Sequence, residues 1–133
     1  MKTKKRIRII IAVVCVVILI AAAYFINYML RVNRYQEEVS NLTYSDINIS
    51  NIADGSYTGE CDVDFIYAKV EVNVKDGKIT GIKLLEHKNE RGSSAEAITD
   101  KIVKEQRIDV DVISGATNSS KVIKKAVENA LEQ

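Results

Sequence analysis

Residues that commonly bind metals are scarce in this 133-residue chain, which has one histidine and two cysteines. Structural zinc and iron–sulfur sites take most of their ligands from these two residue types, and c-type haem needs a Cys-x-x-Cys-His sequence. That sequence is absent, as is the glycine-rich fingerprint of dinucleotide-binding folds. Cys15 lies inside a long apolar run and Cys61 far beyond it, so they are not expected to form a disulfide. Zinc, haem c and iron–sulfur chemistry are therefore excluded.

Acidic residues are absent from the first 36 positions, although the chain as a whole has a net charge of only +1. All 18 acidic residues follow the apolar run, together with 14 of the 19 basic ones, so this larger part has a net charge of −4. Nucleic-acid binding needs concentrated lysine and arginine on the folded part. We therefore expect no nucleic-acid partner.

The apolar run covers residues 9–30, which are 22 positions without a charged side chain. At helical rise this length crosses the roughly 30 Å hydrocarbon core of a bilayer. Five basic residues precede the run, and only Arg31 and Arg34 follow closely. This bias predicts a single-pass anchor in the cytoplasmic membrane, with residues 1–8 in the cytoplasm and the remainder on the external face. A cleaved signal peptide is the alternative, but its apolar region is normally only about 7–15 residues long.

Residues 31–53 are predicted to form a tether between the anchor and a folded domain. Apolar residues at helical spacing indicate that the anchor helix continues before it frays; they are Val32, Tyr35, Val39 and Leu42. Ile47, Ile49 and Ile52 suggest a short leading strand.

Residues 54–133 predict one α+β domain, a small antiparallel sheet with two packed helices. Residues 54–59 are interpreted as a turn, a short strand and a second turn. Residues 68–75 alternate apolar and polar, Asp76-Gly77 suits a two-residue hairpin turn, and residues 79–85 form the returning strand. Helical patterns follow at about residues 95–107, capped by Ser93 or Ser94, and at about 119–131. In the second helix, Lys121, Lys124 and Lys125 are expected to face solvent.

The candidate site is a loop of small residues that opens directly into the last helix. Its sequence is Asp111-Val112-Ile113-Ser114-Gly115-Ala116-Thr117, followed by Asn118. Free backbone N–H groups and the positive end of a helix dipole favour a phosphate at such a point. Lys121, one turn further on, could offset the phosphate charge. Thr117 has an alternative interpretation as an ordinary helix cap, and Lys121 as a solvated lysine.

Two motifs resemble those of the FMN-binding domain family. Asp111-x-x-Ser114-Gly115-Ala116-Thr117 is similar to the flavinylation motif of the C subunit of the sodium-pumping NADH:quinone oxidoreductase and the G subunit of the Rnf complex. Asp54-Gly55-x-Tyr57-x-Gly59 resembles the start of the same domain. The resemblance covers residues 54–133 and implies FMN on Thr117 through a phosphoester, attached by a separate flavin transferase that uses FAD and Mg²⁺.

One loop departs from that family pattern. Many members have a Glu-Thr-Pro-Gly segment near the flavin, whereas this chain has Glu90, Arg91 and Gly92 without the Thr-Pro. Neighbouring His87 could contact a ligand or could be a surface loop residue.

These features favour a membrane-anchored electron carrier over a complete enzyme. Electrons would arrive from a membrane donor, a quinol or a flavoprotein partner, and leave to an external acceptor. Covalent and non-covalent FMN both remain open. The alternatives are a module that binds a phosphorylated ligand without redox chemistry, and a structural subunit of a membrane complex with a vestigial motif.

Overall fold

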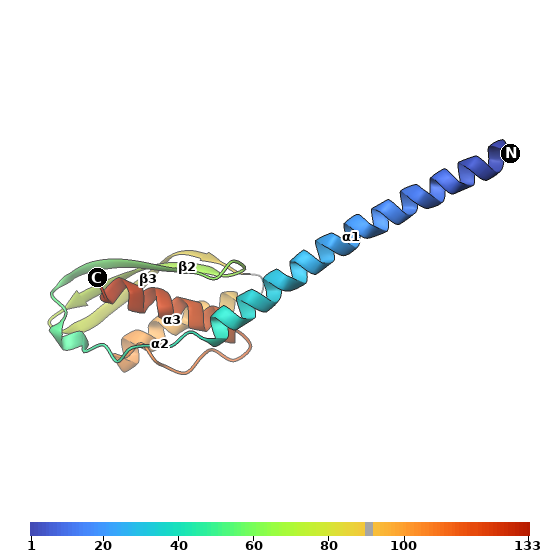
Figure 1. The fold of residues 1–133 in the computed structure, drawn as a ribbon. Coiled ribbons are helices and arrows are strands. Elements are labelled where there is room, and N and C mark those ends of the chain that lie inside the picture. The colour runs from blue at the N-terminus through green and yellow to red at the C-terminus, as the bar shows by residue number, and fades with distance from the viewer. Residues whose placement is uncertain (90–91) are drawn as a thin grey trace. The chain divides into compact units, whose positions relative to one another are not determined.

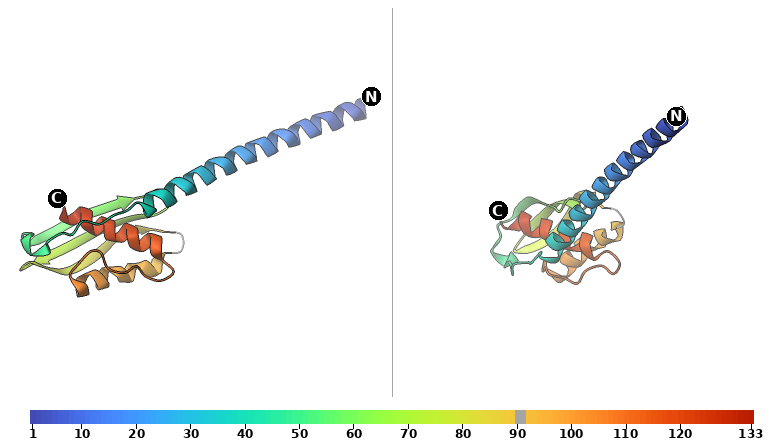
Figure 2. Two further views of the ribbon diagram at one scale, coloured as in Figure 1. Left: turned by 60° about the horizontal axis from the view of Figure 1, so that its bottom comes forward. Right: turned by 45° about the vertical axis from the view of Figure 1, so that its right-hand side comes forward.

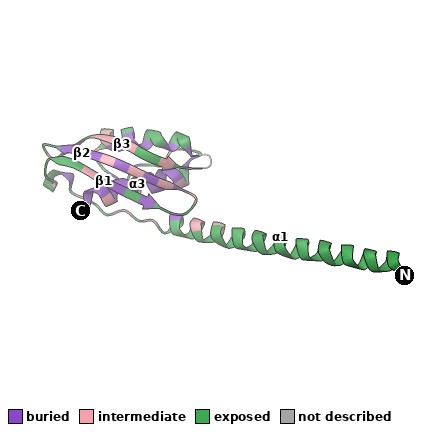
Figure 3. Cartoon of the chain, turned by 90° about the horizontal axis from the view of Figure 1, so that it is seen from above, coloured by how far each residue is buried: buried purple, intermediate pink, exposed green. Residues whose placement is uncertain are grey.

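The computed structural model describes residues 1–89 and 92–133, which divide into two compact units, Met1–Gln36 and Glu37–Gln133. The first unit belongs to helix α1, Lys2–Ser40 (Figure 1). The large apolar side chains between residues 9 and 30 are exposed along this helix (Figure 3). By length and composition, α1 is the one candidate membrane span within the described part of the chain. The helix continues past residue 30, as the apolar spacing of residues 32–42 predicted.

The second unit contains a three-stranded antiparallel sheet in the order β1-β2-β3. The strands are β1 Gly55–Asp62, β2 Tyr67–Lys75 and β3 Lys78–Lys88. The apolar residues of β2 are all buried, which confirms the predicted alternation; they are Ala68, Val70, Val72 and Val74. Asp76 and Gly77 have φ angles of 52° and 70°, as a two-residue hairpin turn requires. The predicted hairpin is therefore confirmed.

Two α-helices cover one face of this sheet (Figure 2). Helix α2, Ile98–Glu105, packs on β3, and helix α3, Thr117–Leu131, packs on β1 and β2. The α+β class and the two packed helices are thus as predicted. The inner face of α3 is almost fully buried through Val122, Ile123, Ala126, Val127, Ala130 and Leu131.

The first predicted helix differs from the structure at both ends. Residues Ser93–Ala97 form a 3₁₀ helix, η2, and Gly92 precedes it without a side-chain cap, so the predicted serine cap is wrong. At the other end, Gln106 adopts a left-handed conformation with φ of 53° and ends α2. Its side-chain amide exchanges hydrogen bonds with the backbone N–H and C=O of Ile79, at 2.9 and 2.7 Å. These two bonds hold the end of α2 against β3, and their free energy offsets the conformational cost of the left-handed Gln106.

Gly59 lies in the middle of β1, so the predicted turn at this residue is wrong. The strand continues because α3 crosses at very short range. A Cβ at Gly59 would lie 2.3 Å from both the carbonyl oxygen of Ala126 and the amide nitrogen of Ala130. The glycine is therefore needed for close packing between strand and helix, not for a turn.

The stretch that follows α1 contains no strand, so the predicted leading strand is wrong. Residues Ile49–Asn51 form a short 3₁₀ helix, η1, because the Asn48 side chain accepts a hydrogen bond from the Ser50 N–H and bends the chain. Ile49 is buried. Residues 43–45, here named the strap, lie against α3: the Tyr44 hydroxyl donates to the Lys121 carbonyl oxygen at 2.8 Å.

Candidate functional site

The predicted phosphate loop forms a tight turn immediately before α3. The Ala116 N–H donates to the Ile113 carbonyl oxygen at 3.0 Å, and Gly115 has a φ of 79°. A turn with glycine in this conformation at its third position is of type II. Ser114 and Gly115 are exposed, and a Cβ built on Gly115 would have no atom within 4 Å. The tip of the turn is thus open to an approaching group.

Thr117 is the first residue of α3 and is exposed. The helix therefore begins two residues before the predicted start, and Thr117 lies inside it rather than at the cap position. The capping residue is Ala116, which is 5% exposed and makes no side-chain capping bond. Its methyl group cannot satisfy the N–H groups of the first turn. A helix start with an exposed hydroxyl and no capping side chain is a suitable place for a phosphate.

A row of buried polar side chains on α3 holds the irregular segments around it. We name Ser120, Lys124 and Glu128 the polar row; they recur every four residues and are 0–3% exposed. The Ile113 N–H donates to the Ser120 Oγ at 3.0 Å, which fixes the turn that precedes the helix. The Lys124 Nζ donates to the Asp109 carboxylate at 2.7 Å and to the Val110 carbonyl oxygen at 2.8 Å. The prediction that Lys124 faces solvent is wrong, because these acceptors and the Tyr44 ring, 4.2 Å away, surround its ammonium group.

Glu128 fastens the strap to the same helix. Its carboxylate accepts the Ser45 N–H at 2.6 Å and the Lys125 Nζ at 2.6 Å. Burial alone would raise the pKa of this carboxyl group, but the hydrogen bonds from Lys125 and Ser45 outweigh it and lower the pKa below its ordinary value. The Glu128 carboxylate is therefore charged, and its bonds to Ser45 and Lys125 give it a structural role.

The polar and charged residues predicted for the site lie before and after the turn in sequence. Asp111 is exposed, and its carbonyl oxygen accepts a hydrogen bond from the Lys101 Nζ at 3.1 Å. Asn118 and Lys121 are half-buried in the first turns of α3. Sequence reasoning missed Lys101, which reaches the loop from α2. The position of Lys101 in the helical pattern does not indicate this contact, because the approach of α2 to the motif depends on the tertiary fold.

A second group of polar residues lies beside the start of α3. The side chain of His87 is only 3% exposed, and its Nδ1 is 3.1 Å from a carboxylate oxygen of Glu96 in η2. Its backbone pairs with Ala68, so the imidazole lies on the helix-covered face of the sheet. The Asn89 side chain lies 3.3 Å from the same Nδ1 and also accepts the Gly92 N–H at 2.9 Å. We name His87, Asn89, Gly92 and Glu96 the imidazole cluster.

The cluster contacts α3 directly through Gly92. A Cβ on Gly92 would lie 2.0 Å from the Oγ of Ser119, in the first turn of that helix. The Nε2 of His87 is buried and has no hydrogen-bond partner among the described residues. A buried polar atom left in this state costs about 1–3 kcal/mol. Glu90 and Arg91, where the loop departs from the flavin-associated sequence, lie outside the described residues.

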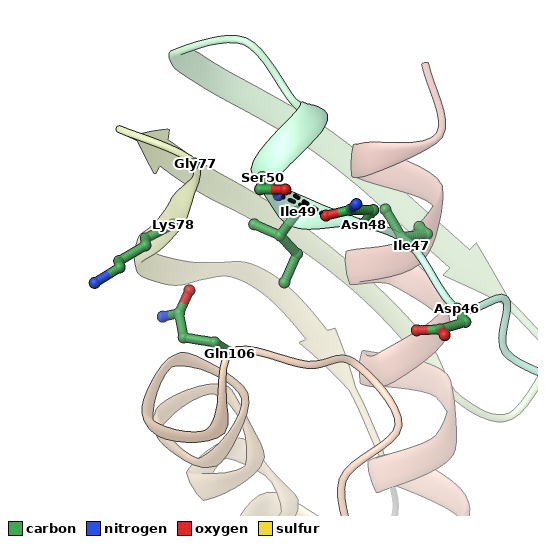
Figure 4. Close-up of a pocket in the computed structure, with 8 residues that line it drawn as sticks. All are labelled: Asp46, Ile47, Asn48, Ile49, Ser50, Gly77, Lys78 and Gln106. Atoms are coloured by element: carbon green, nitrogen blue, oxygen red, sulfur yellow. Dashed lines mark hydrogen bonds between the residues drawn. The ribbon is translucent and has the colours of Figure 1, made fainter.

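Two other features lie outside this site. Burial raises the pKa of the Cys61 thiol to about 11, so the thiol is protonated and unreactive. An open pocket of about 440 Å³ is lined by residues of the strand-to-strand turn, the end of α2 and the segment around η1 (Figure 4). Gly77 and Lys78, at the start of β3, line this pocket, whereas the imidazole cluster and the motif lie at the end of that strand. The pocket and the predicted phosphate site are therefore at opposite ends of β3.

The domain is thus an antiparallel sheet covered on one face by helices, with the exposed Thr117 at a helix start that has no capping side chain. Residues 64–132 match the model of the FMN-binding domain family. That match spans more than half of the chain, and the chain belongs to this family. No curated protein and no solved structure matches the chain. The cofactor is FMN. The open turn at Gly115 fits its presence, as does the Nε2 of His87, which has no partner in the part of the chain that the structure describes.

Proposed function

We propose that this chain is a membrane-anchored flavoprotein that carries FMN on Thr117 through a phosphoester and relays electrons outside the cytoplasm. The observation that carries the proposal is the position of Thr117, exposed at the start of α3 and directly after an open turn. Once bound, FMN supplies one- and two-electron chemistry. The protein supplies the attachment point, the helix dipole that favours a phosphate, and Lys121 as a nearby cation.

Attachment requires a separate enzyme on this proposal. The Thr117 Oγ1 would attack the flavin-side phosphorus of FAD, forming an O–P bond as the bond between the two phosphates breaks. AMP leaves, and the hydroxyl proton passes to a base of the transferase. The chain has a single histidine, and its imidazole is buried against Glu96, so it is no base for Thr117. An exposed motif on a preformed turn is a substrate that such an enzyme could reach.

The relay begins at the membrane. Helix α1 serves as an uncleaved anchor with its basic N-terminus in the cytoplasm, and the five-to-two bias of flanking basic residues supports this orientation. The domain then lies on the external face. Electrons come from a quinol or a membrane flavoprotein and leave to an external acceptor. The net charge of −4 after the apolar run favours a partner with a basic docking surface.

The direct test is mass analysis of the full chain after co-expression with a flavin transferase. We expect one FMN-sized mass addition and in-gel flavin fluorescence for the wild type. Thr117→Ala should lose both signals and still fold, because the side chain is exposed and alanine favours the helix. Thr80→Ala is the matched control, since it removes an exposed threonine hydroxyl outside the motif and should leave loading unchanged. Covalent flavin on Thr117→Ala would contradict the assigned residue. A wild-type chain that only ever binds free FMN would exclude the phosphoester.

A further inference from the structure

Two independent features meet at the start of α3. One is the uncapped helix end with Thr117, and the other is the imidazole cluster, which touches Ser119 through Gly92. Asn89 and Gly92 connect the imidazole to Ser119 in the first turn of the helix. The Nε2 of His87 is buried and has no hydrogen-bond partner among the described residues, and it belongs to the cluster that touches the helical turn beginning at Thr117.

The surroundings of His87 determine which of its nitrogens carries the proton. Asn89 is oriented by the Gly92 N–H, which donates to its Oδ1, so its amide NH₂ faces the Nδ1 of His87. The Glu96 carboxylate lies closer to Nδ1, at 3.1 Å compared with 3.3 Å, and a charged acceptor binds an N–H more strongly than an amide donor binds a lone pair. Nδ1 is therefore the protonated nitrogen, and Nε2 presents a lone pair. The site can accept a hydrogen bond and offers no proton of its own.

The ligand that suits this lone pair has an N–H on a flat ring. The oxidised isoalloxazine ring of FMN has a single ring N–H, between its two carbonyl groups, and otherwise presents acceptors along its polar edge. We propose that His87 is the ring-contact residue of the bound flavin, with Nε2 accepting a hydrogen bond from this N–H. Glu96 is a positioning residue that holds the imidazole in the required tautomer. This inference rests on the proposed attachment of FMN near Thr117.

Burial of the imidazole gives the proposal a further consequence. Because the His87 side chain is 3% exposed, a ring that reaches Nε2 must displace part of the imidazole cluster. The backbone signals of Asn89 and Gly92 should therefore change when flavin is loaded. Lys88, whose ammonium group donates instead to the Asp64 carbonyl oxygen, offers a neighbouring residue for comparison.

The experiment uses the fact that the chain has one histidine. Full-length protein with ¹⁵N-labelled histidine, purified in detergent micelles through a histidine-free tag, gives one pair of ring nitrogen signals. From the contacts of Nδ1 with Glu96 and Asn89, we expect the flavin-free chain to show a protonated Nδ1 and an unprotonated Nε2. Loading with FMN by the transferase should shift the Nε2 signal towards that of a hydrogen-bonded acceptor, and Nδ1 should stay protonated.

Variants distinguish a direct contact between His87 and the flavin ring from a purely structural role of His87. Glu96→Gln should increase the share of the other tautomer and weaken the Nε2 shift on loading. His87→Ala should alter the visible absorption band and fluorescence of the attached flavin, His87→Gln should restore part of the change, and Lys88→Ala should leave both spectra as in the wild type. Flavin that attaches while the His87 signals and the His87→Ala spectra stay unchanged would overturn this inference and leave the proposed function intact. Wild-type chain that takes up no flavin at all would refute both.

Discussion

The contact between Gly59 and α3 gives a sharp test of the packing. In Gly59→Ala, the new methyl group would lie 2.3 Å from two backbone atoms of the helix, whereas ordinary contacts begin at 3.4 Å. No side chain can rotate away, so α3 or β1 must move by about 1 Å. Overpacking of a filled core lowers the free energy of unfolding by roughly 1–3 kcal/mol. Because the new methyl group would clash with backbone atoms, which cannot rotate away, we expect a loss near the upper end, about 3 kcal/mol. For a domain of this size, that loss lowers the melting temperature by about 12–24 °C.

The control is Gly81→Ala, on β3. A Cβ at Gly81 would meet no atom within 4 Å, so this variant should melt within a few degrees of the wild type. Both variants would be measured as full-length protein by circular dichroism during heating and by urea unfolding. Flavin loading adds a second measurement, because a displaced α3 carries Thr117 with it, and loading should fall for Gly59→Ala alone. Equal melting temperatures for Gly59→Ala and the wild type would refute the argument that strand and helix backbones approach this closely.

Three further predictions follow from the fold and the charge pattern. Gly77→Val should destabilise by about 1–3 kcal/mol in urea unfolding, because a β-branched residue resists the φ of 70° and its Cβ would lie 3.1 Å from Ser50; an unchanged midpoint would contradict the turn geometry. Glu128→Gln should cost about 3 kcal/mol at pH 7, because it breaks a buried ion pair. The pKa of Glu128 in the folded state lies below its ordinary value, so the stabilisation by its carboxylate is present at neutral pH and is lost as the pH falls through that folded-state pKa. A stability difference between Glu128→Gln and the wild type that is as large in acid as at pH 7 would refute this. Protease added to right-side-out vesicles should release a fragment beginning within residues 31–53, and protection of the domain until the membrane is opened would reverse the proposed orientation.

The sequence predicted the parts of the fold that depend on local patterns. Alternation along residues 68–75, the Asp76-Gly77 pair and the apolar stripe of the last helix each reflect one repeated geometry, and all three agree with the structure. Gly59 was misinterpreted because glycine in a turn and glycine under a helix look the same in a single sequence. The helix that excludes a side chain there lies about 70 residues further along the chain.

The candidate site was predictable only in part. The motif placed Thr117 correctly at a helix start, because the turn and the helix are contiguous in sequence. The burial of His87 was not predictable, since it depends on η2 folding over the end of β3. Lys124 was assigned to solvent because a lysine between apolar residues normally reaches water. Its acceptors come from residues 109–110, which no periodic pattern connects to α3.

The strap has a consequence for how the protein folds. Its bonds to α3 join residues that are 77 to 83 positions apart, at Tyr44, Thr43 and Ser45. Contacts of such long range require a large loop to close before they contribute, and they form slowly. During synthesis, the strap and all three strands leave the ribosome before the helix that they need. The early chain therefore has its apolar sheet face uncovered, and the rate at which α3 docks determines how long that face is exposed to aggregation or to chaperones.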